Sequence, residues 1–234
     1  MGRPSLLKPL DYLKRLLDRR YVGIRIDRQS PERVGQADLQ IADVLFCYGG
    51  VPNIPWQIIS HGSSGPYVHA AVYMGDSLVS EATTKGVLST SVSDFVARYK
   101  YIAVTRCPGV QGDPALASRV RNFCAYHISS RTKYDFIGAC LSPAYEILDL
   151  MYQRATCRTI SFNWPRSRTR TFCSQFVLDA FVSGGYIPSN YYALGARSPT
   201  ALAEENFLHF IGYLSNARSL LPLVEDDFFW SGGG

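Results

Sequence analysis

The chain has 234 residues, of which 47% are hydrophobic, 18% charged and 13% aromatic. This length supports one large domain or two small ones, and the composition excludes a disordered tail, a coiled coil and a low-complexity scaffold. Lysines and arginines exceed acids by 24 − 19 = 5, which permits an anionic partner without requiring one. We expect no nucleic-acid partner.

Residues 5–20 carry leucines at helical spacing among several cations, which predicts a basic amphipathic helix. Such a helix either docks on its own domain or makes peripheral contact with an anionic membrane surface. Asp11 and Asp18 interrupt its positive charge and favour docking. The uncharged core of a signal peptide is missing here, and no apolar run is long enough to span a membrane. We expect a cytoplasmic protein, or one exported by a signal-independent route.

Strand signals cluster in the first half of the chain. They cover Ile41–Phe46, Tyr67–Met74, Leu78–Ala82 and Tyr101–Arg106. A turn at Gly75-Asp76 joins the second strand to the third.

Helical periodicity dominates the second half, and Gly184-Gly185 marks a stop. The predicted helices are Pro114–Ser129, Phe136–Tyr152, Phe172–Ser183 and Pro199–Leu214. Early strands flanked by helices, with no repeat or linker, predict an α+β fold with a small antiparallel sheet packed against helices. We expect a single catalytic domain over 1–234, with a basic helical extension over 1–36 and a helical segment over 190–234.

The cysteines lie sixteen or more residues apart and form no CxxC pair, which argues against a zinc ribbon or a redox motif. They are Cys47, Cys107, Cys124, Cys140, Cys157 and Cys173. Without a secretory signal, most are expected to be small buried thiols. Of the histidines, His127 at a helix end and His209 in the last predicted helix are expected to be structural.

His69 and Glu81 form the first candidate pair. Side chains alternate along a strand, so His69 and Ala71 share one face, and the small Ala71 leaves room above the imidazole. Folding the hairpin about Gly75-Asp76 brings His69 opposite position 81, within one residue. A carboxylate there can orient an imidazole and stabilise its cation. The alternative is an exposed cross-strand ion pair, which the apolar neighbours of Glu81 disfavour.

Cys173 is the candidate nucleophile. An apolar stripe predicts a helix, and Thr171 as its N-cap places Cys173 in the first turn. There the exposed N–H groups and the helix dipole favour a thiolate. The segment before Cys173 contains five arginines and no acidic residue, which should lower the thiol pKa further and attract anionic substrates. These arginines are Arg154, Arg158, Arg166, Arg168 and Arg170. The alternative is an inert buried cysteine.

The order of these segments resembles a known family. A strand Ala42–Phe46 is followed by the strand with His69, by Ser80-Glu81-Ala82, by Tyr134-Asp135-Phe136 and by Phe172–Val177. This order is similar to the circularly permuted NlpC-type papain-like cysteine hydrolases, a permutation shared with the lecithin:retinol acyltransferase group. The resemblance covers roughly residues 40–185 and implies a papain-like α+β fold.

The resemblance implies that Cys173 is the nucleophile, His69 the base and Glu81 the orienting residue, with no cofactor and no metal. Asp43 and the Tyr134-Asp135 pair match motif positions with a structural role. The acyltransferase group carries Asn-Cys-Glu-His at its nucleophile, whereas this chain has Phe-Cys-Ser-Gln. This departure favours the bacterial permuted amidases.

The resulting hypothesis is a cysteine hydrolase that cleaves an amide bond in a peptide or a peptidoglycan stem through a thioester. Delivery as a secreted antibacterial effector would suit a chain without a signal peptide. Alternatives are a lipid acyl hydrolase or acyltransferase, acting on another anionic substrate, and a non-catalytic membrane-associated module. A metal hydrolase built on His61, His69 and a carboxylate is a further rival.

Overall fold

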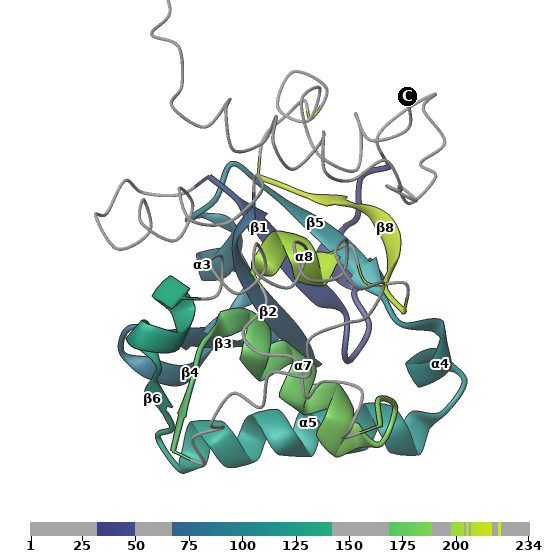
Figure 1. The fold of residues 1–234 in the computed structure, drawn as a ribbon. Coiled ribbons are helices and arrows are strands. Elements are labelled where there is room, and N and C mark those ends of the chain that lie inside the picture. The colour runs from purple at the N-terminus through teal and green to yellow at the C-terminus, as the bar shows by residue number, and fades with distance from the viewer. Residues whose placement is uncertain are drawn as a thin grey trace, which may run out of the picture.

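The computed structural model describes residues 32–49, 67–141, 169–188, 198–203, 205, 207–216 and 220. In this part of the chain, six strands form one antiparallel sheet in the order β4-β3-β2-β1-β5-β8 (Figure 1). The strands are β1 (Val44–Tyr48), β2 (Tyr67–Gly75), β3 (Leu78–Thr83), β4 (Gly86–Ser91), β5 (Tyr101–Arg106) and β8 (His209–Leu214).

Helices cover both faces of the sheet, so the hydrophobic core consists of two clusters, one on each face. They are α3 (Val92–Val96), α4 (Pro108–Gln111), α5 (Pro114–Ser129), α7 (Cys173–Gly184) and α8 (Pro199–Ala203), preceded by the short 3-10 helix η1 (Gln36–Asp38). The larger core cluster joins α5, α7 and α8 to one face, and α3 contributes to the cluster on the other face. Figure 1 shows α5 and α7 packed side by side. This arrangement confirms the predicted α+β class.

β2 lies inside the sheet between β1 and β3, and all nine of its residues are buried. Its side chains alternate between the two core clusters, with Val72 on the α7 side and Ala71 and Tyr73 on the α3 side. A strand covered on both faces is expected to be almost entirely apolar. His69 is therefore a polar exception in a strand that packing would otherwise fill with hydrophobic residues.

The ladder between β2 and β3 is shorter than the two strands that form it. It pairs Gly75 with Leu78 and ends where Val72 pairs with Ser80. β2 nevertheless begins at Tyr67, and β3 continues to Thr83. The two strands thus lose their mutual hydrogen bonds over the stretch that carries His69 and Glu81, which leaves polar backbone groups for other partners.

A second, two-stranded parallel sheet leads into α7. It pairs β6 (Lys133–Tyr134) with β7 (Arg170–Thr171), and the Asp135 N–H extends it by donating to the Thr171 carbonyl. α7 starts two residues after β7 and ends at Gly185, whose φ of 84° suits the left-handed C-terminal cap. The predicted stop at Gly184-Gly185 is thereby confirmed.

Most predicted elements are confirmed, α5 and β5 with identical bounds. The predicted helix from Phe136 is helical over its described part, 136–141. The prediction of one helix over Pro199–Leu214 is wrong beyond Ala203, because β8 follows and places His209 in a strand within the supposedly helical segment 190–234. Phe207, Phe210, Ile211 and Leu214 imitate helical spacing, but dense aromatic and β-branched residues also suit a strand.

Six short elements were not predicted: η1, β4, α3, α4, β6 and β7. The predicted helix over 5–20, His61, Cys157 and the arginines from Arg154 to Arg168 lie outside the described residues. Within the described residues, no helix is both long and apolar enough to cross a membrane.

Candidate active site

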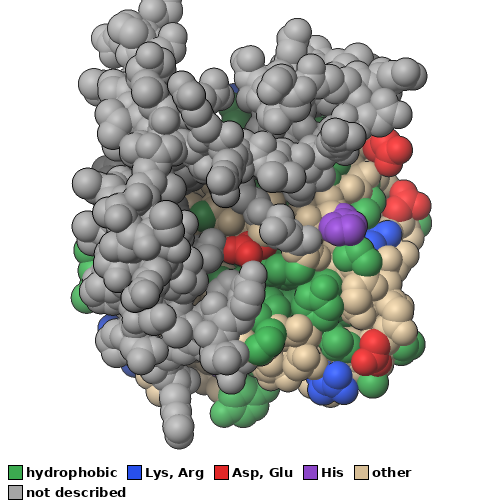
Figure 2. All heavy atoms as spheres, turned by 45° about the vertical axis from the view of Figure 1, so that its right-hand side comes forward, with side chains coloured by type: hydrophobic (Ala, Val, Ile, Leu, Met, Phe, Trp, Pro, Cys, Tyr) green, Lys and Arg blue, Asp and Glu red, His purple; other side chains and the backbone are tan. Residues whose placement is uncertain are grey.

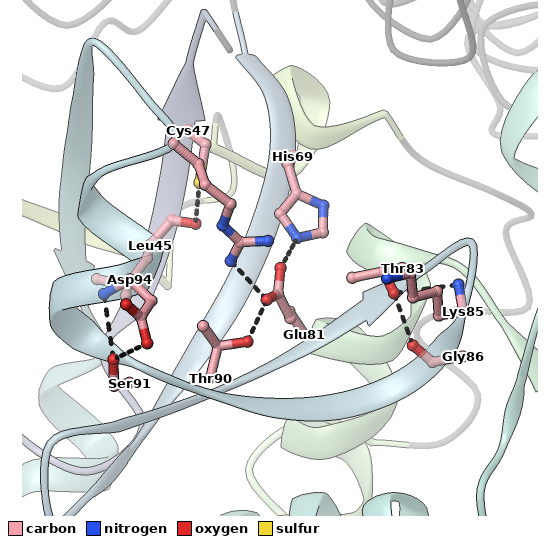
Figure 3. A network of polar contacts seen from close by, with 11 residues as sticks. Leu45, Cys47, His69, Glu81, Thr83, Lys85, Gly86, Thr90, Ser91 and Asp94 are labelled. Atoms are coloured by element: carbon pink, nitrogen blue, oxygen red, sulfur yellow. Dashed lines mark hydrogen bonds and ion pairs between the residues drawn. The ribbon is translucent and has the colours of Figure 1, made fainter. Parts of the chain in front are cut away.

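The structure brings His69 and Glu81 into direct contact inside the protein. The imidazole Nε2 lies 3.1 Å from Glu81 Oε2, and the side chains are 1% and 0% exposed. Figure 3 shows the carboxylate of Glu81 pointing at the imidazole from the neighbouring strand. An exposed ion pair, the alternative weighed above, is excluded by this burial.

The pair forms by a register that differs from the predicted one. Val72 pairs with Ser80, so Glu81 lies level with Ala71, two positions along from His69. The carboxylate therefore reaches the imidazole diagonally, past the small side chain of Ala71. Contact survives because residues two apart on a strand share a face.

Glu81 has two further partners, which the sequence analysis missed. Thr90 of β4 donates its hydroxyl to Glu81 Oε1 at 2.6 Å (Figure 3). Arg98 Nη2 donates to the same oxygen at 2.6 Å. A buried carboxylate needs such donors, because an unpaired charge away from water is costly. Together with His69, they satisfy both oxygens of Glu81.

Arg98 occupies the turn between α3 and β5, and aromatic rings hold its guanidinium. Its Cζ lies 5.0 Å from the ring centre of Phe95 and 5.6 Å from that of Tyr99. The same two rings flank His69, each with its centre 6.3 Å from the imidazole. Cation–π stacking of this kind restrains a long side chain that would otherwise be mobile. The aromatic pair thus shapes both the imidazole site and the arginine site.

Cys173 is the first residue of α7, as the prediction of a first-turn position required. The predicted N-cap is wrong, however: Phe172 takes that position without a side-chain cap, and the Thr171 hydroxyl donates to the Phe172 carbonyl. Thr171 belongs to β7, where it pairs with Tyr134. Backbone pairing therefore orients the entry to the helix in place of a cap.

The Cys173 sulfur sits where the β2–β3 ladder is interrupted. The pKa of its thiol responds to the His69 imidazole and to the backbone N–H groups of Ala70 and Ser174, so these groups lie beside the sulfur. Burial on its own raises the pKa of the Cys173 thiol, but His69 and these two N–H groups outweigh it and hold the pKa below its usual value. The thiolate form is thus favoured.

The pKa of His69 is raised and the pKa of Glu81 is lowered, which complements the lowered pKa of Cys173. Burial lowers the pKa of His69, but Cys173 and Glu81 together raise it from 6.5 to about 9. Burial raises the pKa of Glu81, yet His69, Arg98 and Thr90 lower it from 4.5 to about 2. Glu81 engages Nε2 of His69, and the Cys173 thiol acts on the same imidazole. The arrangement stabilises a thiolate–imidazolium pair backed by a carboxylate.

Two other groups lie close enough to sense the thiolate. Tyr134 of β6 has its pKa raised by burial and by the charge of Cys173. Cys47 pairs with His69 across β1 and β2, and burial raises the pKa of its thiol. Cys47 therefore stays protonated where Cys173 ionises, which distinguishes the two buried thiols chemically.

The remaining candidates occupy supporting positions. Asp43 is buried at the start of β1 and pairs with Arg106, and Asp135 accepts the Gly138 N–H at 3.0 Å at the start of the helical residues 136–141. His127 lies in the last turn of α5 and bonds the Thr132 hydroxyl. These contacts agree with the structural roles expected for Asp43, Asp135 and His127.

None of the five described cysteines forms a disulfide; Cys47, Cys107, Cys124 and Cys173 are buried and Cys140 is partly exposed. No cluster of three His, Cys, Asp or Glu side chains suited to a metal ion occurs among the described residues. Of the five arginines expected near the nucleophile, Arg170 is described and is exposed on β7.

No protein-family model matches the chain. The chain is 24% identical over 216 residues to the probable lipoprotein peptidase YaeF of Escherichia coli (strain K12), an alignment covering 80% of this chain and 74% of YaeF. Among solved structures, it resembles the metalloprotein yiiX of Escherichia coli O157:H7 (DUF1105), with a TM-score of 0.46, 15% identity, and 74% of this chain and 96% of that chain covered. Over most of its length, then, the chain is similar in sequence to a protein named as a probable peptidase.

Proposed function

We propose that this protein is a papain-like cysteine hydrolase of the permuted NlpC type, which cleaves an amide bond with Cys173 as nucleophile. The observation that carries the proposal is the buried chain of contacts from Cys173 through His69 to Glu81, at the first turn of a helix. A merely structural cysteine needs neither an imidazole partner nor a helix N-terminus. The similarity to a probable lipoprotein peptidase supports the same class of reaction.

The reaction begins with attack of the Cys173 thiolate on the carbonyl carbon, which forms a C–S bond and leaves a negative charge on oxygen. At the first position of α7, the Cys173 N–H has no acceptor within its own helix and can donate to that oxyanion. The protonated His69 gives its proton to the leaving nitrogen, and the C–N bond breaks to a thioester. His69 then accepts a proton from water, whose oxygen attacks the thioester and releases the acid and Cys173.

Glu81 supports these proton transfers by orienting and stabilising the protonated His69, without contacting the substrate. Its charge stabilises the imidazolium, and its bond to Nε2 orients the ring. Thr90 and Arg98 in turn hold the carboxylate ionised and fixed. Glu81 is therefore the orienting member of the proposed triad.

The test offers the purified protein peptidoglycan fragments, lipopeptides and mixed phospholipids, and identifies any cleaved bond by mass spectrometry. We expect amide cleavage that Cys173→Ala abolishes and that Cys140→Ala, which removes a partly exposed thiol, leaves intact. Full activity in His69→Ala would refute the assignment. Activity that survives Cys173→Ala but is lost on chelation would favour the metal-hydrolase alternative.

Cleavage of phospholipid alone would point to the lipid acyl hydrolase or acyltransferase alternative with the same nucleophile. If no substrate is cleaved, the rate of Cys173 alkylation by iodoacetamide decides between an enzyme and a binding module. An activated Cys173 should react faster at neutral pH than Cys140, whose pKa is raised by burial. An alkylation rate of Cys173 that rises with pH only where an ordinary free thiol ionises argues for the non-catalytic module. Delivery as an effector stays a prediction from sequence.

A further inference from the structure

The helical residues 136–141 present an unusual outer face. At 100° per residue, Phe136, Cys140, Ile137 and Leu141 occupy a continuous arc of about 140°. Phe136, Ile137 and Leu141 are 45%, 63% and 38% exposed, while Gly138 and Ala139 on the opposite side are buried. The solvent side of a surface helix is normally polar. Here the side turned outward carries no polar side chain, and we call it the apolar arc.

Four exposed cations lie on the segment that leads into this helix or on segments that pair with it: Lys85, Arg131, Lys133 and Arg170. Lys133 and Arg170 come from β6 and β7, which lead into this helix and into α7. The β3–β4 turn that carries Lys85 packs against the segment after α5, since the Val87 N–H donates to the Thr132 carbonyl at 2.9 Å. We call these four residues the cation group. The nearest described acid on the same segment, Asp135, is half-buried and caps the Gly138 N–H.

Two members of the cation group are register partners. Lys133 lies directly opposite Arg170 in the parallel β6–β7 ladder. Paired residues of a ladder project on the same face, and like charges placed opposite each other destabilise the pair. An anionic partner would remove this repulsion. By contrast, Figure 2, which brings the opposite edge of the molecule forward, shows described acidic and basic side chains scattered and mixed in sign.

The inner side of the helix that carries the apolar arc packs beside the residue that precedes the candidate nucleophile. Ala139 and Phe172 share a small hydrophobic cluster with Tyr134, and Phe172 immediately precedes Cys173. The helix is visible as the short teal helix following β6 at the left of Figure 1. The surface that carries the apolar arc is thus one helix away from the start of α7.

We propose that the apolar arc and the cation group together dock the protein on an anionic lipid bilayer. Apolar side chains on a helix enter the boundary between headgroups and acyl chains, while flanking lysines and arginines contact lipid phosphates. An acidic peptide would match the cation group but would leave Phe136, Ile137 and Leu141 in water. The docking does not require catalysis, so its failure leaves the proposed hydrolase untouched.

The test measures binding of the full chain to phosphatidylcholine vesicles with and without phosphatidylglycerol, by flotation, in a Cys173→Ala background and in the unsubstituted chain. We expect binding that requires phosphatidylglycerol and weakens with salt. Lys133→Gln/Arg170→Gln should weaken it about 25-fold, at about fivefold per cation. Phe136→Gln/Ile137→Gln should weaken it at least about tenfold by removing apolar area.

Matched controls are Tyr126→Ser, which removes an aromatic side chain 65% exposed on α5, and Lys100→Gln, which removes an exposed cation outside the surface. Both should bind as the unsubstituted chain does. The proposal is overturned by absence of binding, or by binding that survives both double variants and is lost on changing the lysines within 5–20. A dimer that Phe136→Gln/Ile137→Gln abolishes, without vesicle binding, would assign the surface to a second copy.

Discussion

Two buried acids of this sheet each pair with an arginine, yet their surroundings give them different chemistry. Asp43 is 1% exposed and receives two hydrogen bonds from Arg106, at 2.7 and 2.8 Å. Glu81 is 0% exposed and receives a single bond from Arg98, at 2.6 Å. Each pair consists of an acid and an arginine from different segments of the chain. The other hydrogen-bond partners of the two acids distinguish the pairs.

The other partner of Asp43 is the Gln40 N–H, which donates to Oδ2 at 2.7 Å and closes the turn before β1. The third partner of Glu81 is the titratable imidazole of His69. Burial raises the pKa of Asp43 despite Arg106, whereas the cations around Glu81 overcome burial and lower its pKa to about 2. A buried acid–arginine pair therefore anchors the backbone where its other partner is a backbone N–H, and it tunes a titratable site where its other partner is an imidazole.

The largest effect should come from neutralising each acid in turn. Glu81→Gln keeps the shape of the side chain but removes the negative charge next to His69. The kcat/KM for the substrate that the mass-spectrometry test identifies should therefore fall by about 10³-fold. Asp43→Asn should leave kcat/KM within about threefold wherever the variant is folded, as checked by circular dichroism. Equal losses in the two variants would break the comparison.

The pH profile should distinguish the two acids next. Activity requires the thiolate of Cys173 and the cation of His69, so it rises through the lowered pKa of Cys173 and falls through the His69 pKa of about 9. In Glu81→Gln, the imidazolium loses its counter-charge, and the alkaline limb should move down toward 6.5. In Asp43→Asn the alkaline limb should stay in place. Initial rates across pH 5 to 10 provide the measurement, and a common shift would contradict the assignment.

Replacing the arginines tests the other half of each pair. Arg106→Met leaves Asp43 buried without its cation and should lower the free energy of unfolding by about 3 kcal/mol. Arg98 is 36% exposed, so water can replace part of its contact, and Arg98→Met should cost about 1–2 kcal/mol. Urea unfolding measures both. Hydrolysis should drop only in Arg98→Met; a drop confined to Arg106→Met would reverse the roles assigned here.

The smallest expected effect concerns a single hydroxyl. Thr90→Val removes one donor to Glu81 without changing shape and should lower the free energy of unfolding by about 1 kcal/mol. Thr105→Val is the matched control, because its hydroxyl makes a longer bond, 3.4 Å to the Val44 carbonyl near Asp43. The control should lose less stability, and a larger loss there would show that Glu81 does not depend on Thr90.

The sequence singled out His69, Glu81 and Cys173 because each breaks a local pattern: a polar residue in a buried strand, an acid among apolar neighbours, a thiol at a helix start. Their proximity followed from hairpin folding and from the family resemblance. The diagonal register did not, because the turn lies at Asp76-Ser77 rather than at Gly75-Asp76 and the pairing shifts between Tyr73 and Gly75.

Arg98 and Thr90 left no comparable signal. Arg98 lies seventeen positions from Glu81, in a turn whose residues show no periodicity, and its role emerges only when α3 places the turn over β2 and β3. Thr90 lies in β4, a segment whose serines and threonines are also typical of a loop. Its pairing with β3 is visible only in the structure. Such partners of a buried charge are determined by tertiary packing, which composition and spacing cannot reveal.

The docking of α7 on β2 also has a consequence for synthesis. His69 and Glu81 leave the ribosome early, whereas Cys173 follows 173 − 69 = 104 residues after His69. Local hairpins form long before contacts of such high sequence separation. His69 acts on the Cys173 thiol only once α7 has docked on β2, so the thiol of the nascent chain keeps its ordinary pKa until then. Activation of the sulfur thereby reports the docking of α7.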